Sequence, residues 1–225
     1  MTDTDYDRYS PTALSAYHRA AGGSGKEGDL GNGIILRQHY RSIPVIAGVS
    51  NLLCNYGMII KTSPKPSLLG ANLIACHVEG EIVDHVNQAE LDAVEGLIEK
   101  LLKAGYCLNS SDNQNTIGVI SPYRRQADTL TERLRARWKE FALDSIGTVH
   151  TFQGGQKSVI ILSTRQCPRL DSIWFIDRRP NLLNVAVSRA RELFILVGNL
   201  DLLLKGNYTK QLVEYIQKFG EIRCF

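Results

Sequence analysis

The sequence predicts an α/β protein in which one parallel β-sheet is covered by helices on both faces. From Gly33 onward, short apolar segments alternate with longer segments whose apolar residues recur at helical spacing. The apolar segments are hydrophobic at consecutive positions, as in Val159-Ile160-Ile161-Leu162. Strands with that pattern are buried on both faces, which is typical of a parallel sheet whose strands are joined by crossing helices.

Two strands and two helices are expected between residues 34 and 105. The strands are 34–36 and 73–78. Pro44 is expected to start the first helix, because proline lacks a backbone N–H and the N–H groups of a first helical turn have no hydrogen-bond partner within the helix. Asn87 opens the second, with Glu90 three residues later as in a capping box, and the helix stops near Gly105. The apolar faces are predicted to be Val45, Val49, Leu52 and Tyr56 on the first helix, and Leu91, Val94, Ile98 and Leu101 on the second.

The alternation continues to the end of the chain. Further strands are expected at 116–120, 145–149, 158–163 and 193–197. Ser121-Pro122 is a typical helix start, an N-cap residue followed by proline. Two later helices are expected, one at 182–191 and one ended by Gly220. The buried positions are predicted to be Ala127, Leu130, Leu134, Trp138 and Phe141 after Ser121-Pro122, and Leu212, Ile216 and Phe219 in the last helix.

Residues 1–33 have a different composition, and we interpret them as a flexible extension of a single domain at 34–225. Residues 22–33 contain six glycines, which lose too much entropy on ordering to form a regular element. A short helix is expected at 12–20. We find no internal repeat and no second core.

Composition limits the classes of protein to consider. The net charge of +3 does not by itself indicate nucleic-acid binding. The five cysteines form no CxxC pair, so neither a zinc site nor a disulfide framework is expected. No apolar run reaches the ~18 residues that a membrane span needs, and the polar start of the chain carries no signal peptide. These features predict an intracellular protein, cytoplasmic or nuclear, that does not bind membranes.

The glycine-rich segment fails as a phosphate-binding P-loop. Gly25-Lys26 supplies the Gly-Lys pair, but Ala20 occupies the first glycine position and Glu27 replaces the hydroxyl residue that would bind Mg²⁺. No apolar strand precedes the segment, and none ends in Asp-Glu as an acidic metal-binding motif would. The chain alone is therefore predicted to hold neither ATP nor Mg²⁺.

Three polar segments beside predicted strand ends are candidates for phosphate chemistry, because ligands of open α/β sheets bind near strand ends. They are 38–41, 152–156 and 184–191. An arginine guanidinium is planar and permanently charged, and its N–H groups can donate two parallel hydrogen bonds to a phosphate. An arginine finger uses this group to stabilise the negative charge of a phosphoryl group during its transfer. The alternative for these arginines is a surface salt bridge.

The segments together resemble the second RecA-like domain of superfamily 1 helicases of the nonsense-mediated-decay and Okazaki-fragment-processing group. Residues 36–44, LRQHYRSIP, look like helicase motif IV, and residues 117–126, IGVISPYRRQ, match a family segment. Residues 148–154, TVHTFQG, look like motif V, and residues 180–191, PNLLNVAVSRAR, like motif VI. Asn87 and Glu90 match a weaker N-x-x-E helix start. The likeness runs from about residue 34 to 204, in the correct order.

The resemblance implies a role for each matching residue. Arg41 and Arg189 would be finger arginines directed at the γ-phosphate of ATP. Gln153, Gly154 and Gln156 would contact the nucleotide. The residues implied to contact the backbone of a single DNA or RNA strand are Ser121, Pro122, Tyr123, Thr148 and His150. Such backbone contacts carry little sequence preference.

Departures from the family pattern leave a second possibility open. Gln156 stands where motif V has Glu, and His39, Ser42 and Ile43 are unusual in motif IV. The segment before Ile34 resembles only the run that links two domains. ATP and Mg²⁺ are therefore expected only with a P-loop-bearing RecA-like domain, in cis or in trans. The alternative is a non-catalytic nucleic-acid- or partner-binding module. A Rossmann-type metabolic enzyme is disfavoured, because no G-x-G-x-x-G follows a strand.

Overall fold

The computed structural model describes residues 37–110, 114–152, 155–167 and 173–223. The chain divides into two units, Met1–Arg37 and Gln38–Phe225, and the fold below is that of the second unit. The strand expected at 34–36, the helix expected at 12–20 and the glycine-rich residues 22–33 lie outside the described residues. None of the described helices is both long and apolar enough to cross a membrane.

A six-stranded sheet with the order β10-β3-β9-β8-β6-β7 forms the centre of the fold, and every neighbouring pair is parallel. Its strands are β3 (Leu73–His77), β6 (Ile117–Ser121), β7 (Ile146–Thr148), β8 (Lys157–Ser163), β9 (Ala190–Gly198) and β10 (Glu221–Ile222). Two smaller sheets pair β1 (Gln38–His39) with β2 (Ile59–Ile60), and β4 (Ile82–Val83) with β5 (Val86–Asn87). The β4–β5 hairpin was not predicted.

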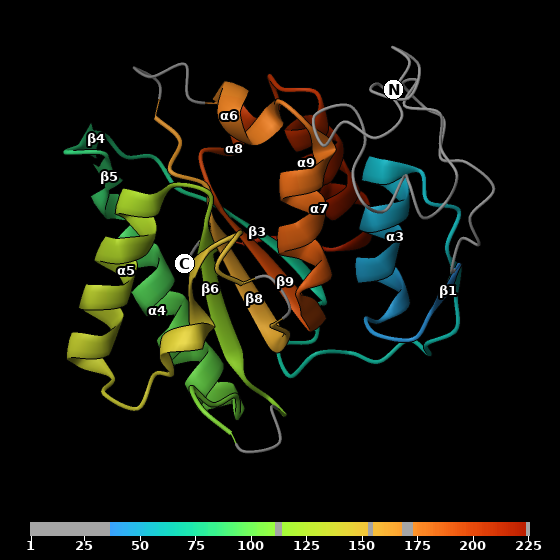
Figure 1. Cartoon of the computed structure of the whole chain (residues 1–225), viewed down its shortest axis with the longest axis horizontal. Helices are drawn as coiled ribbons and strands as arrows, with labels where there is room; N and C mark the ends of the chain where they lie inside the picture. The colour runs from blue at the N-terminus through green and yellow to red at the C-terminus, as the bar shows by residue number, and fades with distance from the viewer. Residues whose placement is uncertain (1–36, 111–113, 153–154, 168–172, 224–225) are drawn as a thin grey trace, which may run out of the picture. The chain divides into compact units, whose positions relative to one another are not determined.

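Helices cover both faces of this sheet, which confirms the predicted fold class (Figure 1). One face packs against α3 (Pro44–Cys54), α6 (Ile173–Asp177), α7 (Pro180–Ser188), α8 (Leu200–Leu203) and α9 (Tyr208–Phe219). The other packs against α4 (Gln88–Ala104) and α5 (Arg124–Arg137), with a 3-10 turn at Leu143–Ser145 before β7. Successive strand residues serve opposite faces: Leu73 lies in the first core and Ile74 in the second.

Several helix ends lie where the sequence predicts them. Pro44 occupies the first turn of α3. The Asn87 side chain caps α4 by accepting a hydrogen bond from the Glu90 N–H at 3.2 Å, and Gly105 ends that helix with φ of 105°. Glycine suits this last position because L side chains disfavour the left-handed region.

The predicted buried face of α3 is correct at Val45 and Val49 and wrong at Leu52 and Tyr56. Ile46, Val49 and Leu53 are buried, whereas Leu52 and Tyr56 are 42% and 50% exposed. The face is set by α7 and α9, which pack against α3 from within the first core. Phe219 of α9 is likewise 51% exposed and pairs with Tyr215 instead of entering the core.

The predicted helix boundaries in two motifs also shift. Ser121 does not cap α5: it is the last residue of β6, where it pairs with Thr148, and the helix starts after Tyr123. The helix expected at 182–191 ends at Ser188, and β9 begins at Ala190. In both places the pairing of neighbouring strands extends β-structure further than local propensity indicates.

Candidate nucleotide and nucleic-acid site

The segments that carry Arg41 and Arg189 are in direct contact, although they are far apart in the sequence. The Ser42 hydroxyl donates to the Ala190 carbonyl at 2.7 Å, and the Ile43 N–H donates to the Arg191 carbonyl at 3.0 Å. These bonds hold the turn before α3 against the junction between α7 and β9. The two candidate finger arginines are therefore positioned by backbone contacts of their immediate neighbours.

The electrostatics of this arginine pair are unfavourable in the absence of an anion. Burial and the positive charge of Arg41 lower the pKa of Arg189. Within the described parts of the chain, the Arg189 Nε is buried without a hydrogen-bond partner, and its Nη1 donates to the Gly155 carbonyl at 3.5 Å. Among the described residues, no carboxylate forms an ion pair with Arg41 or Arg189. Such a pair of guanidinium groups suits a phosphate, whose oxygens accept charge-assisted hydrogen bonds.

Of the three candidate nucleotide contacts in motif V, only Gln156 is described, since Gln153 and Gly154 lie outside the described residues. Gln156 Oε1 accepts a hydrogen bond from Arg191 Nε at 3.1 Å, which places it beside the arginine pair. Arg189 and Gln156 precede β9 and β8, so this group lies at the amino edge of the sheet. Motif VI was predicted to lie on the helix before the last central strand, and α7 does lie directly before β9.

The candidate strand-contacting residues lie at the other edge, after β6 and β7, and most are buried. Ser121 has no exposed surface, Pro122 is buried, and Thr148 is 9% exposed with its hydroxyl 3.3 Å from that of Thr151. These three side chains therefore present little surface, and their contact with a bound strand stays a prediction. Tyr123 is half-buried and His150 is exposed, so those two remain candidates for direct contact.

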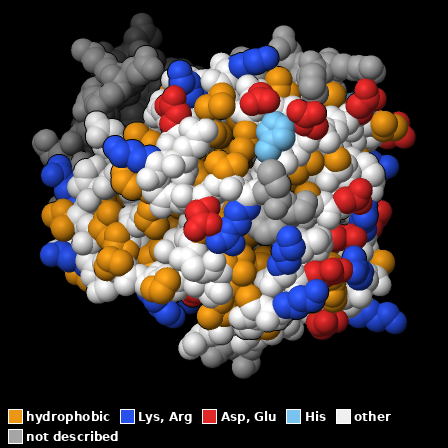
Figure 2. Space-filling model, turned by 180° about the vertical axis from the view of Figure 1, so that it is seen from behind, with side chains coloured by type: hydrophobic (Ala, Val, Ile, Leu, Met, Phe, Trp, Pro, Cys, Tyr) orange, Lys and Arg blue, Asp and Glu red, His pale blue; other side chains and the backbone are white. Residues whose placement is uncertain are grey.

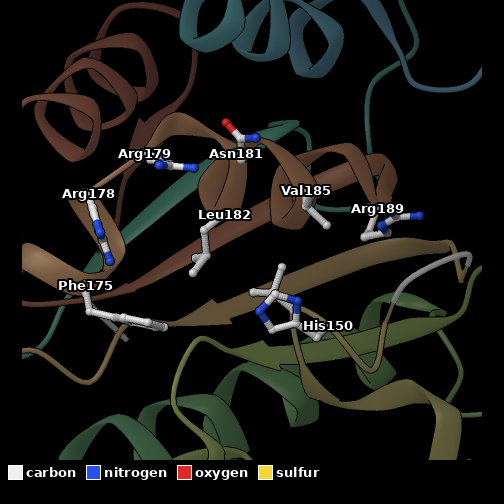
Figure 3. A pocket seen from close by; sticks show the side chains of 9 residues that line it. His150, Phe175, Arg178, Arg179, Asn181, Leu182, Val185 and Arg189 are labelled. Carbon is white, nitrogen blue, oxygen red and sulfur yellow. The ribbon is translucent and has the colours of Figure 1, made fainter. Parts of the chain in front are cut away.

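A pocket of about 550 Å³ joins the two groups (Figure 3). Arg178 and Arg179 lie at one end and Arg189 at the other, while Phe175 and His150 face Leu182 and Val185 of α7. Its volume falls within the ~300–1,000 Å³ typical of small-molecule sites. The described lining residues include no Asp or Glu. By contrast, the face seen in Figure 2 carries acidic and basic side chains interspersed and offers no continuous basic surface.

Beside this pocket lies a cluster of Phe175, Tyr123 and Arg165 that the sequence did not predict, in which the two aromatic rings are tilted by 46° to each other. The centroids of the Tyr123 and Phe175 rings are 5.4 Å apart. The Arg165 guanidinium lies over the Tyr123 ring, 3.7 Å from its centroid. Phe175 is 44% exposed. The three residues come from separate parts of the chain, so no local spacing could have indicated the cluster.

Arg165 is itself fixed by a buried polar network centred on Glu90, which has no exposed surface. Glu90 accepts hydrogen bonds from the Ser163 hydroxyl at 2.7 Å, from the Arg165 N–H at 2.8 Å and from the Gln166 N–H at 3.0 Å. Gln126 extends the network: its Nε2 donates to Ser163 Oγ, and its Oε1 accepts from the Asn87 N–H. The N-x-x-E start and the final Gln of IGVISPYRRQ signalled these residues, but only the fold shows that they meet.

The capping-box interpretation of Glu90 is thus half correct. The Glu90 N–H donates to the Asn87 side chain, as in a capping box. The Glu90 carboxyl group, however, does not accept a hydrogen bond from the Asn87 N–H. It accepts one from the Arg165 N–H in the segment after β8. Burial raises the pKa of Glu90 to about 7, opposed chiefly by the hydrogen bonds from Ser163, Arg165 and Gln166. The carboxyl group is a structural brace, because it lies within the core and not at the pocket surface.

Among the described residues, neither the arginine pair nor the pocket brings three or more possible metal ligands together. Possible ligand atoms within 4.8 Å of one another belong to His77, Glu79 and Asp201, at the opposite edge of the sheet. There the His77 Nδ1 accepts a hydrogen bond from the Leu200 N–H at 3.3 Å.

Comparison with known proteins gives the family. The AAA_12 model, described as an AAA domain, matches residues 29–201. The chain is 33% identical over 154 residues to the putative helicase MOV-10 of Gallus gallus, covering 62% of this chain and 16% of that protein. It is 33% identical over 139 residues to the DNA polymerase alpha-associated DNA helicase A of Saccharomyces cerevisiae, covering 61% and 19%.

A solved structure, described as the C-terminal domain of a possible DNA helicase from Lactobacillus plantarum, covers 81% of this chain and 98% of its own, with 17% identity and a TM-score of 0.46. The chain spans less than a fifth of the length of the two curated helicases above. The matched family model covers the four motifs and the arginine pair. The chain therefore belongs to the AAA_12 family and is a C-terminal RecA-like domain of the superfamily 1 helicases of the nonsense-mediated-decay and Okazaki-fragment-processing group.

Proposed function

We propose that this domain is the second half of an ATP-dependent DNA or RNA motor and supplies its arginine fingers, Arg41 and Arg189, in the cytoplasm or nucleus. The observation that carries the proposal is the pairing of these two guanidinium groups without a carboxylate partner among the described residues. Two like charges held together cost free energy, which a bound phosphate would offset.

In the proposed motor, a P-loop-bearing domain in cis or in trans holds the β- and γ-phosphates and Mg²⁺. Arg41 and Arg189 approach the γ-phosphate from the other side and stabilise the negative charge that develops as the phosphoryl group leaves. Gln156, bonded to Arg191, contributes a neutral hydrogen bond to the nucleotide. Closure on ATP and opening after hydrolysis would move the domain along a single strand, which contacts Tyr123 and His150.

The phosphate site can be tested on this chain alone by following the arginine Nε–H signals by NMR during a titration with pyrophosphate. Signals of Arg41 and Arg189 are expected to shift together, with a dissociation constant in the millimolar range, about −4 kcal/mol. Arg135, an exposed arginine on α5, serves as the internal control. Saturation of other arginines without any shift at Arg189 would contradict a phosphate site at the pair.

The chain alone is expected to bind single strands weakly and to leave ATP unhydrolysed. Only half of the strand-binding groove is present, so we expect dissociation constants in the non-specific range, about 10⁻⁴ to 10⁻⁶ M, that rise steeply with salt. Fluorescence anisotropy at two salt concentrations, beside a phosphate-release assay, measures both properties. Salt-independent binding, or turnover that survives Arg189→Ala, would argue instead for a non-catalytic module or a different active site.

A further inference from the structure

The buried Glu90 carboxyl group joins α4 to the segment that follows β8. Its Oε2 accepts hydrogen bonds from the Ser163 hydroxyl and the Arg165 N–H, and its Oε1 accepts one from the Gln166 N–H. Two successive backbone N–H groups thus point at one carboxylate, an arrangement with which protein backbones bind anions. Here the anion is a side chain of the same domain.

Arg165 has a backbone conformation that this carboxylate stabilises. Its φ is 53°, in the left-handed region that L side chains disfavour. From this turn the Arg165 Nη1 donates to the His85 carbonyl at 3.1 Å, and the guanidinium lies over the Tyr123 ring, 3.7 Å from its centroid. Glu90 therefore holds the backbone from which the Arg165 side chain reaches Tyr123.

Protonation of Glu90 would not affect its hydrogen bonds equally. A buried protonated carboxyl group needs an acceptor for its O–H, and backbone N–H groups are donors only. The Asn87 side chain also presents its NH₂ group to Oε1, at 3.5 Å. The Ser163 hydroxyl is different, because a hydroxyl group both donates and accepts. The proton therefore belongs on Oε2, the oxygen that Ser163 faces.

The Arg165 N–H is bonded to that same oxygen, so its hydrogen bond is the one that protonation weakens. Oε2 changes from an ionised acceptor to a hydroxyl oxygen, which accepts a weaker hydrogen bond. Oε1 becomes a carbonyl oxygen and keeps its hydrogen bond from Gln166. The weakened bond is thus the one that offsets the cost of the left-handed conformation at Arg165.

The surroundings of Glu90 bring its change of charge close to neutral pH. Burial raises the pKa of Glu90 to about 7, and the hydrogen bonds that the carboxylate accepts oppose this shift. In the described part of the chain, the Arg165 guanidinium is the charged group that acts on Glu90, and it favours the ionised form. Gln126 on α5 and Asn87 on β5, which complete the network, are uncharged. His85 is exposed and meets Arg165 through its backbone carbonyl.

We propose that Glu90 is a pH-dependent switch for the turn after β8: its ionised carboxylate holds Arg165 in the left-handed conformation and over the Tyr123 ring, and its protonation releases Arg165 from both. All of the contacts involved lie within this domain. The inference therefore goes beyond the proposed function and does not depend on it. Its consequence is that the position of Arg165 on the Tyr123 ring depends on pH.

NMR titration of the wild-type chain tests the switch. The ¹³C signal of the Glu90 carboxyl group, the amide signal of Arg165 and the ring signals of Tyr123 should titrate together, with a midpoint at about pH 7. Protection of the Arg165 amide from hydrogen exchange, corrected for intrinsic base catalysis, should be about fivefold lower at about pH 6 than at about pH 8, because an ionised acceptor forms the stronger hydrogen bond.

The stability of the whole domain should change in the opposite direction. Folding raises the pKa of Glu90 from its ordinary value of 4.5 to about 7, so the stability that neutral Glu90 contributes is fully present below 4.5 and is lost as pH rises through 7. Relative to Glu90→Gln, the unfolding equilibrium constant of the wild type should rise about tenfold from about pH 6 to about pH 8. Greater protection of Arg165 in a less stable domain is a combination that a general effect of pH on stability does not give.

Three substitutions assign the titration to Glu90. Glu90→Gln should abolish the titration of Arg165 and Tyr123, because an amide does not change charge in this range. Glu99→Gln, which alters a partly exposed carboxyl group on the same helix, and His85→Gln should leave that titration in place.

The wild-type titration is decisive even if Glu90→Gln does not fold. A Glu90 carboxyl signal that titrates without any response of Arg165, or an Arg165 amide that is insensitive to pH, would overturn the proposal. So would a titration of Arg165 that persists in Glu90→Gln or disappears in His85→Gln.

Discussion

Replacing Arg189 by alanine is expected to lower kcat by about 10³-fold or more in a motor reconstituted from this domain and a P-loop-bearing first domain. The Nε of Arg189 is buried without a hydrogen-bond partner among the described residues, and the positive charge of Arg41 lowers the pKa of Arg189. In the proposed motor, its guanidinium would meet the charge that develops during the reaction. Because the domain's fold does not depend on an ion pair of Arg189, thermal stability should stay unchanged or rise.

Two further variants and one binding measurement make this result specific. Arg189→Lys keeps the charge but loses the planar fork, so it should restore only a small part of the activity. Arg135→Ala removes an exposed arginine from α5 and should leave kcat within about twofold of wild type, because surface substitutions are usually near neutral. Strand binding should be nearly unchanged by Arg189→Ala. A reconstituted motor whose kcat is insensitive to Arg189→Ala would remove Arg189 from the catalytic machinery.

Replacing Glu90 by alanine is expected to lower the free energy of unfolding by about 3 kcal/mol or more, because each buried donor left unsatisfied costs about 1–3 kcal/mol. The Ser163 hydroxyl and the N–H groups of Arg165 and Gln166 would all lose their acceptor. Denaturant unfolding monitored by circular dichroism measures this change.

Two further substitutions separate the lost hydrogen bonds from the lost charge. Glu90→Gln keeps the shape of the side chain but turns an amide NH₂ towards donors, so an intermediate loss of about 1–2 kcal/mol is expected. Glu99→Ala, on the same helix, removes only a surface ion pair with Arg137 and should change stability by less than about 1 kcal/mol. If Glu90→Ala were as mild as Glu99→Ala, Glu90 would not be the brace of this edge.

Local signals in the sequence predicted the layers of the fold and most element starts. Pro44, Asn87 and Gly105 mark helix ends through backbone chemistry that acts within a few residues, so they could be identified without the fold. The motif resemblance also selected Arg41 and Arg189, which the structure brings together through a contact between residues 148 positions apart, Ser42 and Ala190.

The features that were missed depend on distant parts of the chain. The buried face of α3 differs in part from the predicted face because α7 and α9 pack against it and determine which of its side chains are buried. Ser121 satisfies the local pattern of a helix cap, yet pairing with β7 makes it a buried strand residue. The cluster of Arg165, Tyr123 and Phe175 joins three segments that share no spacing. Tertiary packing overrides local preference in each case.

ATP turnover by this chain, by a P-loop-bearing first domain, and by the two together tests most directly whether the domain is half of a motor. Each half alone should show only background hydrolysis, since in the proposed motor the arginine pair and the P-loop lie on different domains. Together, in the presence of a single strand, they should hydrolyse ATP at a rate that falls with Arg189→Ala. Robust hydrolysis by the purified chain alone, or no gain on mixing or fusing two folded halves, would contradict the proposed division of the active site.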